Sequence, residues 1–493
     1  MTGPLIGLPP RIHPLVRSFL AGQPGPAGLL GRFGSPLNVL FPEIFTANVA
    51  GFRDELDASG LAYRICYAHK ANQSRAFVRA ARAAGIGIDV ASPGELDSAL
   101  AAGFPPGLIE ATGPKGRDFL GVLAGSGVTV NADNLWELGE LAQLGRAGGY
   151  RVPVLVRMCG LGPQDPGRPS RFGVPAARFG TVTDVLAAAG DAVDFLGLSF
   201  HLDSSEAGDR VRAVDECLPL LERAWAAGLS PRILDVGGGF RQAFADSPEP
   251  FGEYGQAVRR GLAGHGPPLT WGGATLGFRF EDAGIRGALT SGKYAGTAGG
   301  RDMLRELIAS PLPGQGGRTV ARVLRENMLE LWLEPGKALA DHAGLTLATV
   351  EFTKEAADGS VLVNLDLSRD KICSAGQEVM LDPVLLYRSA APPAPGPGGV
   401  RAGVFFAGNL CLERDMITSH LTFVDRLPGP GDIVAFVNTA AYQMDLSASA
   451  ALMHPRPGRA VVRADAAGGW AAHADHEEAR EEAGPCSTST SPS

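Results

Sequence analysis

Charged residues follow several of the short apolar runs in this sequence. Lys70 ends the run YRICYAHK, residues 63–70, and Glu334 follows the apolar part of LELWLEPG, residues 329–336. An ammonium group at the end of a buried strand is costly unless it is paired or used. A lysine in a partly desolvated site has a lowered pKa and can attack a carbonyl carbon. Lys70 is therefore a candidate nucleophile.

Three further features would complement such an amine. The triplet Gly237, Gly238 and Gly239 follows an apolar run, and consecutive glycines let backbone N–H groups approach a phosphate. Glu334 could keep a heterocyclic nitrogen protonated, and His201 could stack on an aromatic ring. Singly, these features have ordinary structural explanations, namely a loop, a salt-bridged rim residue and a core histidine. Together they match the needs of pyridoxal 5'-phosphate (PLP).

The elements that would position these groups are short apolar runs alternating with Ala/Leu-rich amphipathic stretches. Eight parallel strands with intervening helices indicate an α/β fold of the (β/α)8 TIM-like barrel type, in which the carboxyl ends of the strands meet at one mouth. The predicted strands are residues 63–70, 86–92, 107–113, 127–133, 151–158, 194–202, 232–239 and 329–336.

Changes in composition divide the chain into four parts. After residue 340 the runs become strand-like, with Gly, Pro and Asp turns between them, which predicts an antiparallel β domain over residues 341–464. Residues 46–340 would form the barrel, with an insertion at about 265–328. Residues 1–45 are expected to join the β domain. The charged, then Ser/Thr/Pro-rich stretch 465–493 is expected to be a disordered tail.

Bulk properties exclude several classes. The formal net charge is −8 and no basic patch stands out, so we expect no nucleic-acid partner. No run reaches the roughly 18 apolar residues of a membrane span, and the proline-rich start lacks a signal-peptide pattern. The six cysteines form no CxxC pair, which indicates a reducing compartment. We therefore expect a cytoplasmic protein with no membrane partner, and no metal site is predicted.

Seven separated motifs resemble those of one enzyme family. They occur in the order seen in the fold type III PLP-dependent decarboxylases, the group of diaminopimelate, ornithine and arginine decarboxylases, and cover most of residues 40–460. The resemblance implies an alanine racemase-like barrel with a C-terminal β domain, amino-acid decarboxylation, and a homodimer with shared active sites. The motifs are YAHKAN, DVASPGEL, FHLDSS, LDVGGGF, LEPGKAL, GNLCLERD and PGDIVAF with AAY.

The resemblance also implies roles for single residues. Lys70 resembles the Schiff-base lysine, Glu334 the partner of the pyridine nitrogen, and His201 the ring-stacking histidine. Cys411 resembles the cysteine that enters the partner subunit's site and protonates the carbanion. The implied cofactor-binding set is completed by Asp89, Glu95, Arg157, Ser204, Gly237, Gly238, Gly239, Lys337 and Tyr442, and the substrate-binding set is Leu412, Tyr387 and Asp415.

Four departures from the family pattern concern the phosphate and the substrate. Lys337 stands where the family usually has arginine, and Asp203 replaces the glycine before Ser204. Leu412 follows Cys411 where relatives carry an acid that binds a distal ammonium, and Met453–His454 replace a Phe-Asn pair. Because an apolar side chain cannot pair with a buried cation, we expect a substrate other than a simple diamino acid.

Two alternatives remain open. The first keeps PLP but changes the reaction to racemisation or other chemistry at Cα, as in the alanine racemases, which place a tyrosine base on the β domain. The second is a non-catalytic homologue that binds a partner, like the antizyme inhibitors. Cys411 in its GNLC context favours decarboxylation over racemisation, and retention of Lys70, His201, Glu334 and Cys411 argues against a non-catalytic homologue.

Overall fold

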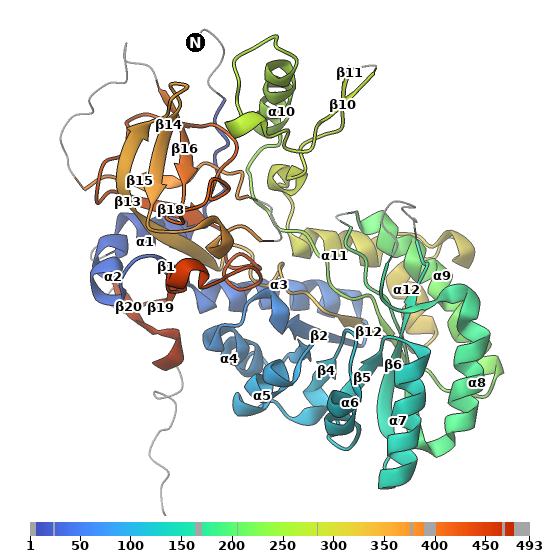
Figure 1. Ribbon diagram of the computed structural model, residues 1–493. Coiled ribbons are helices and arrows are strands. Elements are labelled where there is room, and N and C mark those ends of the chain that lie inside the picture. Colours follow the sequence, from blue (N-terminus) through green and yellow to red (C-terminus); the bar gives the residue numbers. More distant parts are fainter. Residues whose placement is uncertain are drawn as a thin grey trace, which may run out of the picture.

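The computed structural model consists of a barrel and a β domain that lie side by side (Figure 1). The barrel occupies the middle of the chain, and the β domain gathers strands from both ends. The described residues are 6–22, 25–162, 170–204, 206–282, 284–374, 378–388, 401–465 and 469–477.

Eight parallel strands form the barrel, and their order around the ring follows the chain. Pairing of β5 with β6 and of β2 with β12 completes the circle. Most of these residues are buried, as expected where helices cover the outside and side chains fill the inside. The predicted (β/α)8 barrel is confirmed, and each predicted run overlaps one strand. The strands are β2 (Tyr63–Ala68), β3 (Gly87–Val90), β4 (Ile109–Ala111), β5 (Thr129–Ala132), β6 (Val152–Cys159), β8 (Val193–Ser199), β9 (Ile233–Asp235) and β12 (Glu330–Leu333).

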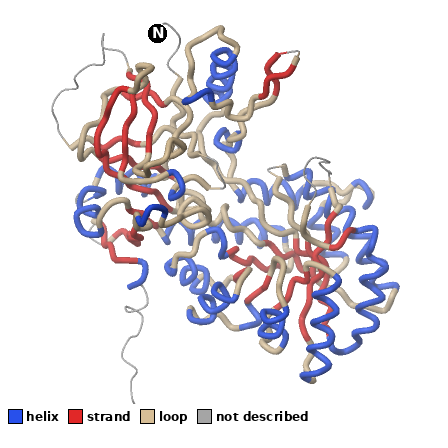
Figure 2. Tube along the Cα trace, in the orientation of Figure 1, coloured by secondary structure: helices blue, strands red, loops and turns tan. Residues whose placement is uncertain are grey.

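Helices surround the barrel (Figure 2). Several begin at side chains that accept hydrogen bonds from the first free backbone N–H groups, namely Ser74, Ser92 and Asn134. These caps fix where the chain turns from a strand into a helix, and thus the loops at the barrel mouth. The helices are α3 (Pro42–Ser59), α4 (Arg75–Ala83), α5 (Pro93–Ala101), α6 (Arg117–Ala124), α7 (Leu135–Gly148), α8 (Phe179–Ala189), α9 (Ala207–Ala226), α11 (Gly300–Ala309) and α12 (Val320–Glu326).

The β domain is built around the long strand β13 (Gly344–Glu355), which pairs with β1, β14 and β18. Most pairs are antiparallel, as predicted, but β1–β19 and β14–β16 are parallel. Strand β1 comes from the N-terminal segment after α1 (Pro14–Ala21) and α2 (Gly25–Phe33), so that segment lies with the β domain. The other strands are β1 (Leu37–Leu40), β14 (Val361–Leu365), β15 (Val384–Leu386), β16 (Ala402–Ala407), β17 (Thr422–Val424), β18 (Ile433–Val437), β19 (Gly458–Ala464) and β20 (Trp470–Ala474).

The stretch between β9 and β12 divides differently from the predicted insertion at about 265–328. Helix α10 (Glu249–Leu262) and the hairpin of β10 (Arg279–Glu281) and β11 (Gly284–Arg286) lie beside the β domain (Figure 1). The Tyr254 hydroxyl donates to the carbonyl of Leu421 at 2.9 Å. Helices α11 and α12 instead pack on the barrel. The added layer therefore begins at α10 and ends before residue 300.

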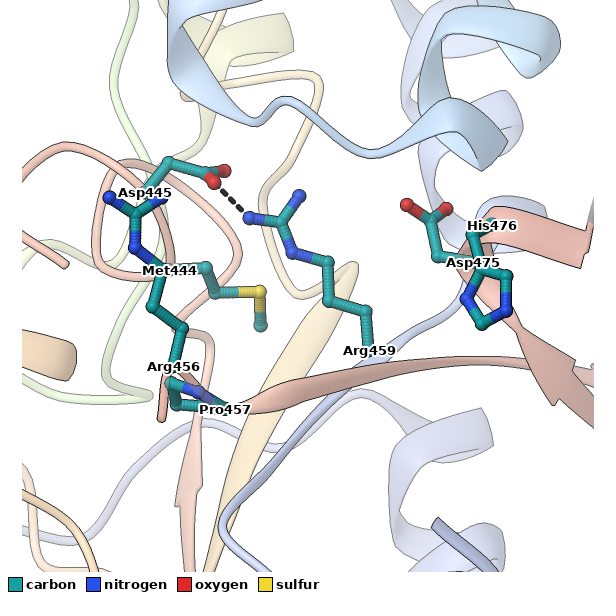
Figure 3. Close-up of a pocket in the computed structure, with 7 residues that line it drawn as sticks. All are labelled: Met444, Asp445, Arg456, Pro457, Arg459, Asp475 and His476. Carbon is teal, nitrogen blue, oxygen red and sulfur yellow. Dashed lines mark hydrogen bonds and ion pairs between the residues drawn. The ribbon is translucent and has the colours of Figure 1, made fainter. Parts of the chain in front are cut away.

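The expected start of a disordered tail at residue 465 is wrong, because β20 pairs with β19. Beyond β20, the buried carboxylate of Asp475 accepts hydrogen bonds from the Ser74 hydroxyl and from the backbone of Ala76. This caps α4 from the other end of the chain. Next to it, Asp445 and Arg459 form an ion pair at a small cavity of about 260 Å³ (Figure 3). Residues 478–493 of the predicted tail lie outside the described residues.

Among the described residues, no helix has both the length and the apolar character needed to span a membrane.

Candidate active site

Lys70 lies in the short turn that follows β2, and contacts with the β domain hold this turn in place. The side chain of Asn72 donates to the carbonyl of Ala440 at 2.8 Å, and the backbone N–H of Tyr442 donates to the carbonyl of Ala71 at 2.7 Å. Asn72 and Ala71 are buried. The Lys70 side chain, 37% exposed, therefore projects from a rigid turn between the two bodies.

The ammonium of Lys70 is paired with a carboxylate from the next strand. Its Nζ lies 3.6 Å from Oδ2 of Asp89. Burial alone would lower the pKa of Lys70, but the charges of Asp89 and Glu334 outweigh it and raise the pKa above its usual value. The expected lowering is therefore wrong. Burial and neighbouring carboxylates raise the pKa of Asp89 to about 7, although Lys70 and a hydrogen bond from Thr112 oppose this.

Glu334, His201 and the glycine turn meet at the same end of the barrel. Nδ1 of His201 lies 3.6 Å from Oε2 of Glu334 and 3.2 Å from the backbone nitrogen of Gly238. Burial would raise the pKa of Glu334, but a hydrogen bond with His201 and the charge of Lys70 lower it to about 2. Burial lowers the pKa of His201. Glu334 is thus a buried carboxylate that stays ionised.

Beneath Glu334 lie two further buried carboxyl groups, Glu110 of β4 and Asp235 of β9. Oxygens of all three groups lie within 4.8 Å of one another. Burial raises the pKa of both Glu110 and Asp235 well above its usual value. The sequence reasoning missed both residues, since a single acid within an apolar run gives no signal of its neighbours across the barrel.

The glycine turn requires its glycines. Gly237 and Gly239 have φ values of 69° and 78°, and a Cβ at Gly238 would lie 2.5 Å from the carbonyl oxygen of Glu334. The buried guanidinium of Arg210 donates to the carbonyls of Gly238 and Leu202, at 2.5 and 2.7 Å, and so ties the turn to the loop after β8. Arg210 was also missed, because it looks like any charged position of a helix.

Two lysines and two acidic residues flank this loop. Nζ of Lys337 lies 3.7 Å from Oδ1 of Asp203. Burial, then the charge of Lys337, lowers the pKa of Lys293 to about 8. Lys293 is therefore close enough to Lys337 for their charges to interact. The Ser204 hydroxyl donates to Asp209 and is engaged inside the loop. Lys293 was missed because it belongs to a stretch without a recognisable pattern.

The remaining predicted cofactor residues lie at or near the mouth. Tyr442 adopts φ of 69°. Burial raises the pKa of its hydroxyl, the charge of Lys70 opposes this rise, and the charge of Asp203 adds to it. Oε1 of Glu95 lies 3.8 Å from Nδ1 of His69, so Glu95 supports the turn beside Lys70. Nη1 of Arg157 lies 4.0 Å from a carboxylate oxygen of Asp133. The predicted cofactor residues of the barrel therefore come from the carboxyl ends of six strands, β2, β3, β6, β8, β9 and β12.

Cys411 lies elsewhere, on the β domain. It is exposed and lines a cavity of about 610 Å³ together with Asn364, Asp366, Lys371 and His454. None of the residues lining this cavity comes from the barrel mouth. Within the described residues of one chain, Cys411 and Lys70 thus belong to separate sites.

The predicted substrate residues share the β domain with Cys411. Leu412 is 41% exposed. The Tyr387 hydroxyl donates to the carbonyl of Arg426 at 2.7 Å. Both carboxylate oxygens of Asp415 accept backbone hydrogen bonds, from Arg369 and Leu410, each at 2.7 Å. Asp415 therefore shapes the Cys411 loop, and the structure does not bring these three residues to Lys70 within one chain.

Comparison with known proteins agrees with this fold. Residues 45–271 match the pyridoxal-binding domain of the pyridoxal-dependent decarboxylases. The chain belongs to this family, the fold type III decarboxylases, whose cofactor is pyridoxal 5'-phosphate.

Individual relatives cover nearly the whole chain. An uncharacterised protein of Sinorhizobium fredii, y4yA, is 31% identical over 474 residues, which are 94% of this chain and 95% of that protein. The diaminopimelate decarboxylase of Bacillus subtilis is 24% identical over 437 residues, 84% of this chain and 83% of the enzyme. The Helicobacter pylori diaminopimelate decarboxylase complexed with L-lysine has the same fold, with a TM-score of 0.64 at 16% identity, covering 91% and 95% of the two chains.

The side chains at the mouth fit this cofactor. The amine of Lys70 lies beside Asp89, and the charge of the ionised Glu334 acts on it. The glycine turn, where a Cβ at Gly238 would meet backbone atoms, lets a ligand approach closely, and Lys337 supplies a cation suited to a phosphate. The donor set therefore matches the aldehyde, the ring nitrogen and the phosphate of PLP in type.

Proposed function

We propose that this protein removes the α-carboxylate of an amino acid as carbon dioxide, with PLP bound through Lys70. The observation that carries the proposal is the meeting of Lys70, Glu334 and His201 at the carboxyl ends of the barrel strands. Family membership supports the same reaction class. In the overall reaction the substrate loses carbon dioxide, gains one proton at Cα and becomes an amine.

PLP, when bound, supplies an electron sink for the electron pair left at Cα. Glu334, with its lowered pKa, favours a proton on the ring nitrogen because it is a weaker base than that nitrogen. Lys70 must lose a proton before its amine can react. Asp89, 3.6 Å away, pairs with this ammonium and holds it in place until the proton is lost.

The phosphate end of the site would be formed by Gly237–Gly239, Lys337 and Tyr442. Lys337 offers a point charge in place of the bidentate fork of arginine. Asp203 lies 3.7 Å from the ammonium of Lys337 and offsets part of its charge. Lys293, whose charge interacts with that of Lys337, would add a second positive charge and so compensate for the charge that Asp203 offsets.

We further propose that two subunits share each active site. Cys411 is exposed on the β domain, beside Leu412 and away from the Lys70 mouth of its own chain. A thiol in that position can reach a substrate only at another subunit's mouth. Cys411 of one subunit would then deliver the proton to Cα at the Lys70 site of the other.

The substrate would be an amino acid without a cationic distal end. Support comes from Leu412, an apolar and partly exposed side chain next to Cys411. A cation placed against it would lose hydration without gaining a partner. Met453, 94% exposed and with φ of 64°, adds apolar surface beside His454, which lines the Cys411 cavity.

The test uses the purified full-length protein. We expect a visible absorption band from bound PLP, and carbon dioxide release from neutral, acidic or acylated amino acids in preference to ornithine or lysine. Chiral analysis of the product distinguishes a racemase, which inverts Cα without releasing carbon dioxide. A stable dimer that binds no PLP would instead identify a non-catalytic homologue and overturn the proposal.

A further inference from the structure

The strongest feature outside the assigned roles is the group of three carboxyl side chains inside the barrel, Glu110, Asp235 and Glu334. Their oxygens lie within 4.8 Å of one another, and each side chain is buried. Three negative charges cannot coexist at this separation away from water. The group must therefore hold either protons or a cation.

The hydrogen bonds around the three groups leave specific oxygens without donors. Oδ1 of Asp235 accepts from the backbone of Gly237 at 2.8 Å, and Oε1 of Glu110 accepts from the side chain of Asn131 at 3.0 Å. The other oxygens, Oδ2 of Asp235 and Oε2 of Glu110, are buried and have no donor among the described residues. They are the atoms on which protons would rest.

The oxygens of the three carboxyl groups lie within 4.8 Å of one another, and the unpartnered oxygens of Glu110 and Asp235 are buried among them. A proton on Glu110 can then be shared with Asp235, and a proton on Asp235 with Glu334. A hydrogen bond between two carboxyl groups requires a proton on one of them. Two such bonds therefore need two protons for three groups.

We propose that Glu110, Asp235 and Glu334 share two protons and one negative charge, and that the charge rests on Glu334. Glu110 donates to Asp235, and Asp235 donates to Glu334. This inference rests on the proposed function only for its consequence at the ring nitrogen. Glu110 is then a positioning residue, because it acts on the cofactor through Asp235 and Glu334.

The physical consequence follows from cooperativity. A carboxylic acid that accepts a hydrogen bond becomes a better donor, so the proton of Glu110 strengthens the bond from Asp235 to Glu334. A stronger donor makes Glu334 a weaker base. The proton between Glu334 and the ring nitrogen then stays on the ring, which is the state that draws electrons from Cα.

Other ionisable groups act on the trio from the surrounding elements. Lys70 and His201 lie on the side of Glu334 and favour its ionised form. Asp89 of β3 disfavours a second negative charge on Glu110. The thiol of Cys66 in β2 is buried, and burial raises its pKa well above the usual value, so it adds no charge. Lys70 and His201 thus favour a negative charge on Glu334, and Asp89 disfavours one on Glu110.

The test is infrared spectroscopy of the full-length protein at pH 7. We expect the difference between wild type and E110Q to contain one carbonyl band of a protonated carboxylic acid, shifted in D2O, and D235N to lose one such band as well. E140Q is the matched control, because Glu140 forms an ion pair with Arg117 at 2.9 Å, so the variant should lose only carboxylate bands.

Two results would overturn the proposal. One is an E110Q difference spectrum with carboxylate bands only, which means that Glu110 is ionised. The other is a stoichiometric divalent metal in the purified wild type that E110Q loses, which identifies a cation site. This arm needs no PLP, so it decides the proton count even if the proposed function fails.

A second readout tests the positioning role with ring-labelled PLP bound. The nitrogen-15 resonance of the ring should keep its protonated value in E110Q, because glutamine can still accept from Asn131 and donate to Asp235. In E110L, which can do neither, we expect a shift toward the neutral pyridine value. An unchanged resonance in a folded E110L would refute the positioning role.

Discussion

The barrel mouth and the Cys411 face differ in how completely one chain builds them. At the mouth, Lys70, Asp89 and Glu334 are fixed by neighbouring strands and have strongly shifted pKa values. On the β domain, Cys411 and Leu412 are exposed around open cavities. A single chain thus builds the proposed cofactor half completely, whereas the proposed substrate half faces outward. Substitutions at the mouth and on the Cys411 face test whether both regions act on the same substrate.

The largest effect is expected at Lys70. K70A should abolish the visible band of bound PLP and lower carbon dioxide release by about three orders of magnitude or more, because the nucleophile is gone. Absorbance and gas release measure the two effects. K354Q, which changes an exposed lysine of β13, should leave both unchanged. Full activity in a folded K70A protein would contradict the assignment.

Cys411 should behave in the opposite way. C411A should keep the visible band and lower carbon dioxide release about a hundredfold, because only the proton donor is lost. Mixing K70A and C411A subunits should restore activity to about a quarter of wild type if each site takes one residue from each subunit of a twofold dimer. No recovery in mixed dimers would argue against shared sites.

The substrate half can be sharpened at Leu412. L412D places a carboxylate beside Cys411 and should change the ratio of kcat/KM between lysine and a neutral amino acid by about tenfold or more in favour of lysine. Steady-state assays with both substrates measure the ratio. The control is L427D, a second exposed leucine on the β domain. An equal change in both variants would remove Leu412 from the pocket.

A smaller effect concerns Asp89 and pH. Its pKa is raised from 3.8 to about 7, so between these values the folded protein holds a proton that the unfolded chain has lost. The contribution of Asp89 to the free energy of unfolding therefore falls as pH rises from about 4 to about 7. Urea unfolding of D89N should lack this part of the decline. Parallel profiles for D89N and wild type would show that Asp89 is ionised throughout.

The smallest effect is expected at Lys293. K293Q should raise the dissociation constant for PLP about two- to fivefold, because a partly screened charge near the phosphate is lost. Pyridoxal, which lacks the phosphate, should bind both proteins equally in the same absorbance titration. A similar loss of affinity for pyridoxal would mean that Lys293 acts on something other than the phosphate.

The sequence was sufficient to predict all eight barrel strands, because each is a short apolar run and most are followed by an amphipathic helix. It also predicted the polar groups that follow those strands, since parallel strands bring their carboxyl ends together. Glu110 and Arg210 could not be found in this way. Their importance depends on partners across the barrel, Asp235 and the glycine turn, which are far away in the sequence.

The layer formed by α10 and the β10–β11 hairpin also escaped prediction. Its apolar residues, such as Tyr254 and Leu269, look like those of another barrel helix and loop. Only contact with Leu421 and its neighbours on the β domain decides where they pack. The same holds for β20, which is short and follows a polar turn, and which becomes a strand by pairing with β19.

The pairing of β1 with β19 determines the order in which the barrel and the β domain can be completed during synthesis on the ribosome. Strand β1 emerges before the barrel, yet its parallel partner β19 emerges more than four hundred residues after it. The barrel strands, by contrast, lie between residues 63 and 333 and can close as soon as the last of them is made. During synthesis the barrel strands are therefore complete before β13 can pair with β1, and β19 completes the second body last.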